Sequence, residues 1–168
     1  LNIDSSLILF DSDEKTLLSR DRRTNVTSAR SALNGYQKGK CFYCFKKIEI
    51  LSGHDALADV DHLFPHVLQR MGLLENLDGV WNLVLACQEC NRGPKGKFDS
   101  VPHRQYVERL EKRNNFLISS HHPLRDTLMK QTGKNYLSRH TFLQRCLNIA
   151  RKYQPSVWQA QETEDPSF

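Results

Sequence analysis

Two pairs of cysteines constrain this chain of 168 residues more than any other feature of its sequence. Each pair has the spacing C-x-x-C: the first is Cys41 and Cys44, and the second is Cys87 and Cys90. Such pairs can place four thiolates about 2.3 Å from a single zinc ion, in a closed tetrahedral shell. Because a shell without an open position cannot activate water, we expect a structural zinc that ties two distant segments together.

The alternative interpretation of these cysteines is a disulfide framework or a set of unbound thiols. Matched pairs are more typical of a metal site in a reducing compartment, and Cys146 is left over as a small core residue.

No apolar run approaches the ~20 residues of a membrane helix, and the apolar stretch from Leu7 to Phe10 is too short for a signal peptide. We therefore expect a cytoplasmic protein with no membrane partner. Because the chain starts at Leu1 and not at methionine, we expect it to be a piece of a longer polypeptide.

Turn residues and hydrophobic spacing divide the chain into four segments, although its length suits one domain. We expect a strand and a helix within residues 1–40 and a core of short strands and loops at 41–98. A helical extension should follow over residues 99–155. The tail at 156–168 is acidic from Glu162 onward, and we expect that part to be disordered.

The helical segments carry more detailed expectations. A strand from Leu7 to Phe10 should precede a helix that is capped by Thr24 or Thr27 and buries Val26, Ala29, Leu33 and Tyr36. Pro102 and Pro123 are expected in first turns of helices, and Gly133 at a helix end. The last helix should end before Pro155 and bury a stripe of Phe142, Cys146, Ile149 and Tyr153.

Between the cysteine pairs, an alternating stretch from Asp59 to Pro65 predicts a strand that carries Asp61 and His62 near its end. Asn82 leads into an apolar strand, and Asn91 follows the second cysteine pair on a short helix. Two strands and a helix would then converge. Asp61 and Asn91 would offer two hard oxygen ligands, which suit Mg²⁺ or Mn²⁺ better than zinc.

In their order and residue pattern, these segments resemble the HNH endonuclease superfamily. The resemblance rests on C-F-Y-C, then V-D-H-L-F-P, then W-N-L-V-L-A-C-Q-E-C-N-R-G, and it covers about Cys41 to Phe98. It is similar to the HNH domains of restriction and anti-phage defence proteins. The resemblance implies an α+β fold, in which a ββα-metal core with a structural zinc is flanked by N-terminal and C-terminal helices.

The resemblance also implies roles for four residues. His62 would be the general base that activates water, Asp61 and Asn91 would hold a catalytic Mg²⁺ or Mn²⁺, and Asn82 would brace the loop that orients His62. Phosphodiester hydrolysis requires these same two elements, a base and positive charge near the phosphate. The implied activity is metal-dependent cleavage of DNA, as one module of a larger restriction or defence protein with other domains or subunits.

Some features depart from the family or leave alternatives open. Asn91 stands where other members carry histidine, and Pro94 is expected to end the helix early and move Lys95 from its usual place. His66 could contact phosphate or metal, or be a loop residue.

Lysines near the first cysteine pair could form a solvated face or bind phosphates. A net charge of +5 favours a polyanionic partner only weakly. The alternatives to DNA cleavage are RNA cleavage and an inactive zinc-binding adaptor for nucleic acid or protein.

Overall fold

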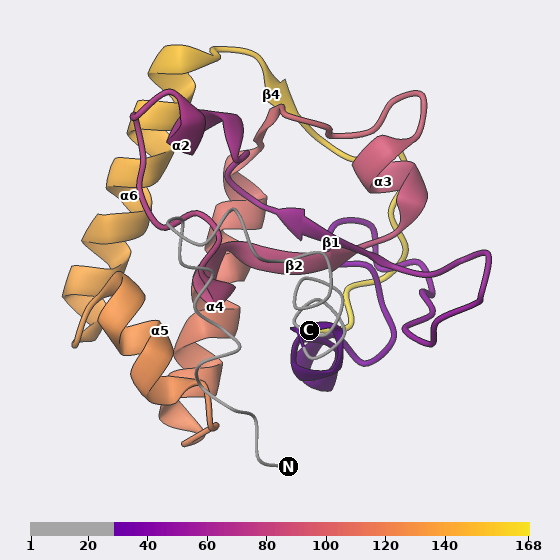
Figure 1. The fold of residues 1–168 in the computed structure, drawn as a ribbon, viewed down its shortest axis with the longest axis horizontal. Helices are drawn as coiled ribbons and strands as arrows, with labels where there is room; N and C mark the ends of the chain where they lie inside the picture. Colours follow the sequence, from indigo (N-terminus) through magenta and orange to yellow (C-terminus); the bar gives the residue numbers. More distant parts are fainter. Residues whose placement is uncertain (1–28) are drawn as a thin grey trace, which may run out of the picture.

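The structure is a computed structural model, and it describes residues 29–168. Long helices lie along one side and short strands and loops lie on the other (Figure 1). The long helices are α4 (Arg104–Ser119) and α6 (Tyr136–Tyr153), with the shorter α5 (Arg125–Thr132) between them in the chain. The α+β class is thereby confirmed. Within the described part of the chain, no helix combines the length and the apolar character that crossing a membrane requires.

The short elements follow the expected succession of strand, strand and helix. Strand β1 (Asp59–His62) pairs antiparallel with β2 (Leu83–Ala86), so that His62 lies opposite Leu83. All four residues of β2 are buried, as a continuous apolar run predicts. Between the strands lie α2 (Val67–Arg70) and the 3-10 helix η3 (Val80–Asn82), and after β2 comes α3 (Gln88–Arg92).

The helix at residues 29–37 covers the free edge of β2. The buried side chain of Gln37 exchanges two hydrogen bonds with the backbone of Leu85, each 2.9 Å long. These bonds satisfy backbone groups that a strand edge otherwise leaves open. Leu33 is buried as expected, and the ring of Tyr36 lies 5.5 Å from that of Phe116. The expected strand at Leu7 to Phe10, the cap at Thr24 or Thr27, and Val26 lie outside the described residues.

The C-terminal helices extend the apolar core, although most of its buried residues lie between Leu33 and Cys90. Their buried side chains join those of the short strands in one continuous core, which also contains the cysteine pairs. Gly133 ends α5 with φ +142°, where a Cβ would lie 2.4 Å from Ser138 Oγ, so the expected helix end is confirmed. The expected stripe of α6 is only partly correct. Cys146 is buried, but Tyr153 is 41% exposed because the buried face is centred on Leu143, Leu147 and Ala150.

Neither proline lies in a first helical turn, so that expectation is wrong. Pro102 belongs to β3 (Val101–Pro102), which pairs in parallel with β4 (Val157–Trp158) and holds the residue extended. Helix α4 therefore begins after His103, whose ring accepts a hydrogen bond from the backbone of Gln105. Pro123 likewise lies before Leu124, the N-cap of α5.

The expectation of a disordered acidic tail is also wrong, because the tail packs across the first cysteine pair. The backbone N–H of Glu164 donates to the carbonyl of Cys44 at 2.8 Å, and the Glu162 carboxylate lies 3.4 Å from Lys46. The ring of Phe168 lies 4.9 Å from that of Phe45. The acidic composition suggested disorder, but the negative charges meet lysines and the terminal aromatic ring meets an aromatic cluster.

Arg113 joins α4 to the start of β2 and provides a test of this packing. It is fully buried and donates to the backbone carbonyls of Val80, Trp81 and Leu83, while burial lowers its pKa to about 10. We expect Arg113→Met to lower the free energy of unfolding by about 3 kcal/mol, since buried carbonyls would lose their donors. Urea denaturation measures the loss. The exposed Arg145→Met is the control, and a loss below about 1 kcal/mol would contradict this role.

Candidate functional site

The four paired cysteines converge although the pairs are far apart in the sequence. Their sulfur atoms all lie within 4.8 Å of one another, and Cys44 Sγ lies 3.7 Å from Cys87 Sγ. A tetrahedron with a metal–sulfur distance of about 2.3 Å has edges of about 3.8 Å, so this spacing fits zinc. None of the cysteines forms a disulfide, which excludes the disulfide alternative in this structure.

Backbone N–H groups and neighbouring thiols favour negative charge on part of this cluster. The N–H of Cys90 donates to Cys87 Sγ at 3.4 Å, and the N–H of Cys87 donates to Cys41 Sγ at 3.3 Å. Hydrogen bonds from Cys41 and from the other two thiols lower the pKa of Cys87. Thiolates are the form that binds zinc, so the surroundings suit a structural metal.

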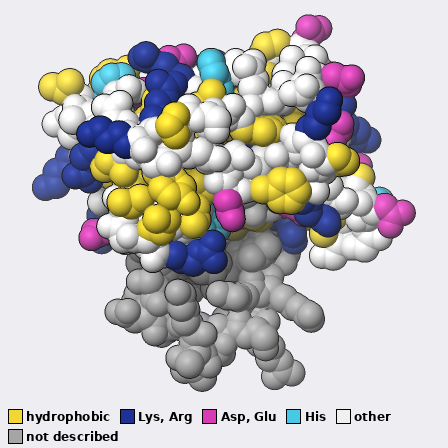
Figure 2. Space-filling model, turned by 90° about the horizontal axis from the view of Figure 1, so that it is seen from above, with side chains coloured by type: hydrophobic (Ala, Val, Ile, Leu, Met, Phe, Trp, Pro, Cys, Tyr) yellow, Lys and Arg dark blue, Asp and Glu magenta, His cyan; other side chains and the backbone are white. Residues whose placement is uncertain are grey.

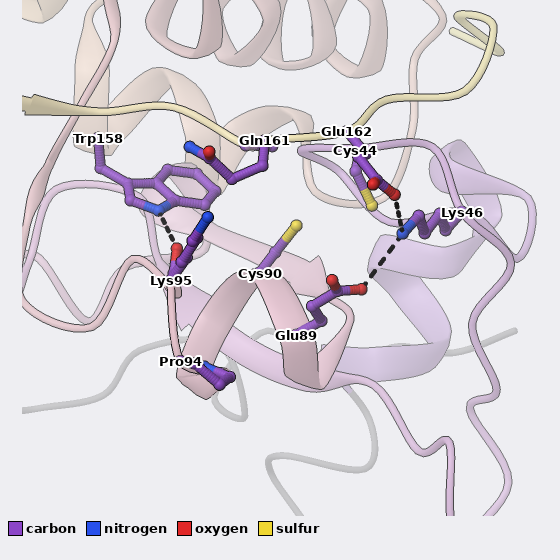
Figure 3. A pocket seen from close by; sticks show the side chains of 10 residues that line it. Cys44, Lys46, Glu89, Cys90, Pro94, Lys95, Trp158, Gln161 and Glu162 are labelled. Atoms are coloured by element: carbon purple, nitrogen blue, oxygen red, sulfur yellow. Dashed lines mark hydrogen bonds and ion pairs between the residues drawn. The ribbon is translucent and has the colours of Figure 1, made fainter.

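A pocket of about 290 Å³ opens beside the cysteine cluster, and the side chains of Cys44 and Cys90 line it (Figure 3). The Trp158 ring forms one wall. On the rim, Lys46 pairs with the carboxylates of Glu89 and Glu162 at 3.3 and 3.4 Å. This lysine is therefore neutralised by protein carboxylates, which does not favour the expectation that it grips phosphates.

Asp61 connects β1 to both cysteine pairs. Its Oδ2 atom accepts a hydrogen bond from the hydroxyl of Tyr43, at 2.5 Å, and lies 3.2 Å from Lys97 Nζ. Tyr43 stands between the first two cysteines, and the backbone N–H of Lys97 donates to the carbonyl of Cys90. Burial, followed by the negative charge of Asp61, raises the pKa of Tyr43 well above its usual value, so Tyr43 remains a donor.

Asn91 contacts the other acidic residue of β1. Its amide nitrogen donates to Asp59 Oδ2 at 3.0 Å, and Arg92 Nε lies 2.8 Å from the same oxygen. Asp59 and Asp61 share one face of β1, because alternate residues of a strand point the same way. The structure thus places Asn91 and Asp61 against the same strand face, with separate hydrogen-bond partners.

His62 belongs to the opposite face of β1 and lies beside Asp78. Its Nε2 atom is 2.8 Å from Asp78 Oδ1, while His66 Nε2 lies 3.2 Å from Asp78 Oδ2. Burial raises the pKa of the Asp78 carboxyl, but the hydrogen bond from His62 and the charge of His66 outweigh this effect, and its pKa lies below the usual value. His66 is therefore part of the same cluster as His62.

Asn82 is fully buried and ties the residues after His62 to the loop before η3. Its Oδ1 atom accepts from the backbone N–H of Phe64 at 2.8 Å. Its amide nitrogen donates to the carbonyls of Phe64 and Leu77 at 3.0 and 2.9 Å. The side chain thus fixes the backbone on both sides of the His62–Asp78 contact.

Sequence reasoning missed Tyr43, Asp78 and Lys97. Tyr43 and Asp78 lie in a cysteine turn and a loop, where no periodicity marks a polar contact. Lys97 was overlooked in favour of Lys95, which is exposed. The turn after α3, closed by a hydrogen bond from Gly96 N–H to the Gly93 carbonyl, carries Lys97 into the core, where its Nζ donates to the His62 carbonyl at 2.8 Å. The expected displacement of Lys95 by Pro94 was the available signal.

Comparisons of the chain with protein-family models, curated proteins and solved structures found no match. Within residues 29–168, the four cysteines are the only group of three or more His, Cys, Asp or Glu side chains close enough to hold a metal ion together.

We expect the purified chain to carry one zinc ion, and Cys87→Ser to lose it. Because this metal joins segments far apart in sequence, its loss should cost several kcal/mol and lower the Tm by about 10 °C or more. Metal analysis and thermal denaturation measure both effects. Cys146→Ser alters a buried cysteine outside the cluster and should keep the zinc; full zinc content in Cys87→Ser would contradict the assignment.

The Tyr43–Asp61 contact is expected to contribute directly to stability. We expect Tyr43→Phe to lower the free energy of unfolding by about 1–3 kcal/mol, since a buried carboxylate loses one of its donors. The cost should be smaller in an Asp61→Asn background, which a double-mutant cycle by chemical denaturation measures. Tyr136→Phe alters an exposed tyrosine and is the control. Equal costs in both backgrounds would show that the two side chains are not coupled.

Proposed function

We propose that this chain is an HNH-type endonuclease, which hydrolyses phosphodiester bonds of DNA with the help of a divalent cation. The observation that carries the proposal is the placement of His62 at the end of β1, paired with Asp78 on one side and next to the anchored Asp61 in the chain. The succession of β1, β2 and α3 beside the cysteine cluster supports a ββα-metal core with a structural zinc.

His62 has the access and the chemistry that a general base requires. Its side chain is 30% exposed, so solvent can reach it. A neutral imidazole has a ring nitrogen with a lone pair, which can accept a proton from an attacking water. Its backbone carbonyl is held by Lys97, and the residues that follow it are held by Asn82, so the ring is attached to a fixed strand end.

The resemblance places a hard cation at Asp61 and Asn91, and each side chain keeps one oxygen that could bind it. Tyr43 and Lys97 both contact Oδ2, and the hydrogen bonds among residues 29–168 leave Oδ1 of Asp61 without a partner. The amide nitrogen of Asn91 donates to Asp59, which leaves its amide oxygen as a further possible metal ligand. Carboxylate and amide oxygens are ligands of Mg²⁺ and Mn²⁺. When bound, the cation would supply positive charge to the phosphate and leaving oxygens.

The charge of the molecule is compatible with a nucleic acid substrate. Figure 2 looks onto the end of the molecule where α2 and β4 lie in Figure 1, and Lys and Arg side chains are spread over this face. With a net charge of +5, such a surface can attract phosphates without reading sequence. By its resemblance to restriction and defence proteins, we propose that the chain acts as the cleavage module of a larger protein.

The test is cleavage of plasmid DNA by zinc-loaded protein with added Mg²⁺ or Mn²⁺, beside a labelled RNA. We expect metal-dependent nicking of DNA that falls at least about 100-fold in His62→Ala, which loses the base. Asn91→Ala, which loses a cation ligand, should also lose activity, in part recoverable at higher Mg²⁺ concentration.

His54→Ala is the matched control, because His54 is exposed and lies in a loop outside the site. It should cleave like the unmodified chain. Full activity of His62→Ala would reject the assigned base. A zinc-loaded chain that cleaves neither nucleic acid would instead favour an adaptor function.

A further inference from the structure

We infer that Asp78 is a positioning residue that fixes the tautomer of His62, so that the ring nitrogen Nδ1, and not Nε2, takes the proton from water. The inference rests on the proposed role of His62 as base, and it adds a role for Asp78, whose contact with His62 that proposal cites. It assigns the acceptance of the proton to one nitrogen of the ring.

The hydrogen bond between the two side chains determines the tautomer. An ionised carboxylate can only accept, so the Nε2 atom that lies 2.8 Å from Asp78 Oδ1 must carry a hydrogen. A neutral imidazole has one N–H, which leaves the lone pair on Nδ1. Among the hydrogen bonds of residues 29–168, none involves Nδ1 of His62. Among the described residues, Arg151 Nε is the only fully buried side-chain nitrogen or oxygen without a partner, so Nδ1 of His62 is reached by solvent.

Asp78 is held in place by groups other than His62. Its Oδ2 atom lies 3.2 Å from His66 Nε2 and 3.4 Å from Gln69 Nε2. The preceding residue, Leu77, is held at both backbone groups, by Gln69 Oε1 at 2.7 Å and by the Asn82 amide at 2.9 Å. The carboxylate position is thus set by α2 and by Asn82, and the His62 ring orients against it.

Solvent reaches the pair of His62 and Asp78. The side chains of His62 and Asp78 are 30% and 20% exposed, whereas Lys97 in the pair with Asp61 is fully buried. The Asp78 carboxylate lies at the Nε2 edge of the ring, which leaves Nδ1 unbonded.

The proton movement follows from this arrangement. As the water oxygen bonds to phosphorus, its proton passes to Nδ1, and the bond from phosphorus to the leaving oxygen breaks with the electron pair on that oxygen. The leaving oxygen then takes a proton from solvent. His62 becomes an imidazolium beside the Asp78 carboxylate, which stays ionised and stabilises the positive charge.

The first experiment observes the tautomer without requiring activity. Nitrogen-15 NMR of the zinc-loaded chain, labelled at histidine and at a pH where His62 is neutral, should show the hydrogen on Nε2. In Asp78→Asn the amide can present either its oxygen or its NH₂ group to the ring, so the population with hydrogen on Nδ1 should rise. A His62 ring that carries its hydrogen on Nδ1 in the unmodified chain would overturn the inference.

The second experiment measures cleavage. We expect Asp78→Asn to lower kcat at least about 30-fold with KM changed less than about 3-fold, because the tautomer affects proton transfer and not binding. In a His62→Ala background the same substitution should cost nothing further. Asp55→Asn makes the same charge change at an exposed residue and should cleave normally.

The outcomes distinguish this inference from the proposed function. An unchanged kcat in Asp78→Asn, or an equal loss with and without His62, would overturn the positioning role while the nuclease stands. A chain that does not cleave would reject both the nuclease and the assignment of Nδ1 as the base atom. The NMR measurement on that chain would still show whether Asp78 fixes the ring.

Discussion

The convergence of four thiols is the constraint on which the rest of this structure depends. It joins a turn near residue 41 to the end of β2 and the start of α3, and both turns then reach toward the same carboxylate. Tyr43 contacts Asp61 from the first turn, and Lys97 contacts it from the loop that follows the second. A metal at the thiols would therefore stabilise the site as well as the fold.

Strand β1 distributes the polar groups between two environments. Asp59 and Asp61 share the face toward α3, whereas His62 belongs to the opposite face with Asp78. The antiparallel register with β2 sets this division, because a shift of one residue would exchange the two faces. A buried ion pair and a water-accessible histidine can thus occupy adjacent positions without neutralising each other.

The short strands need the remainder of the chain for stability. A core of their size buries too little apolar surface by itself. The helices α4 and α6 add further buried apolar side chains to the same core, and Arg113 satisfies the backbone carbonyls where η3 meets β2. The tail adds Phe168 to the aromatic cluster beside the first cysteine pair. Packing, and not only the convergence of the thiols, therefore positions the strand that carries the candidate site.

The sequence by itself determined the features that depend on local spacing: the cysteine pairs, the apolar run of β2 and the helix end at Gly133. It also singled out Asp61, His62 and Asn91. Only the tertiary structure shows that Asp78 contacts His62 and that Lys97, and not Lys95, is buried against Asp61. Only the tertiary structure shows that the acidic tail packs on the first cysteine pair. These contacts join loop residues that are distant in the sequence, and their geometry depends on how turns close and helices pack, which no periodic pattern records.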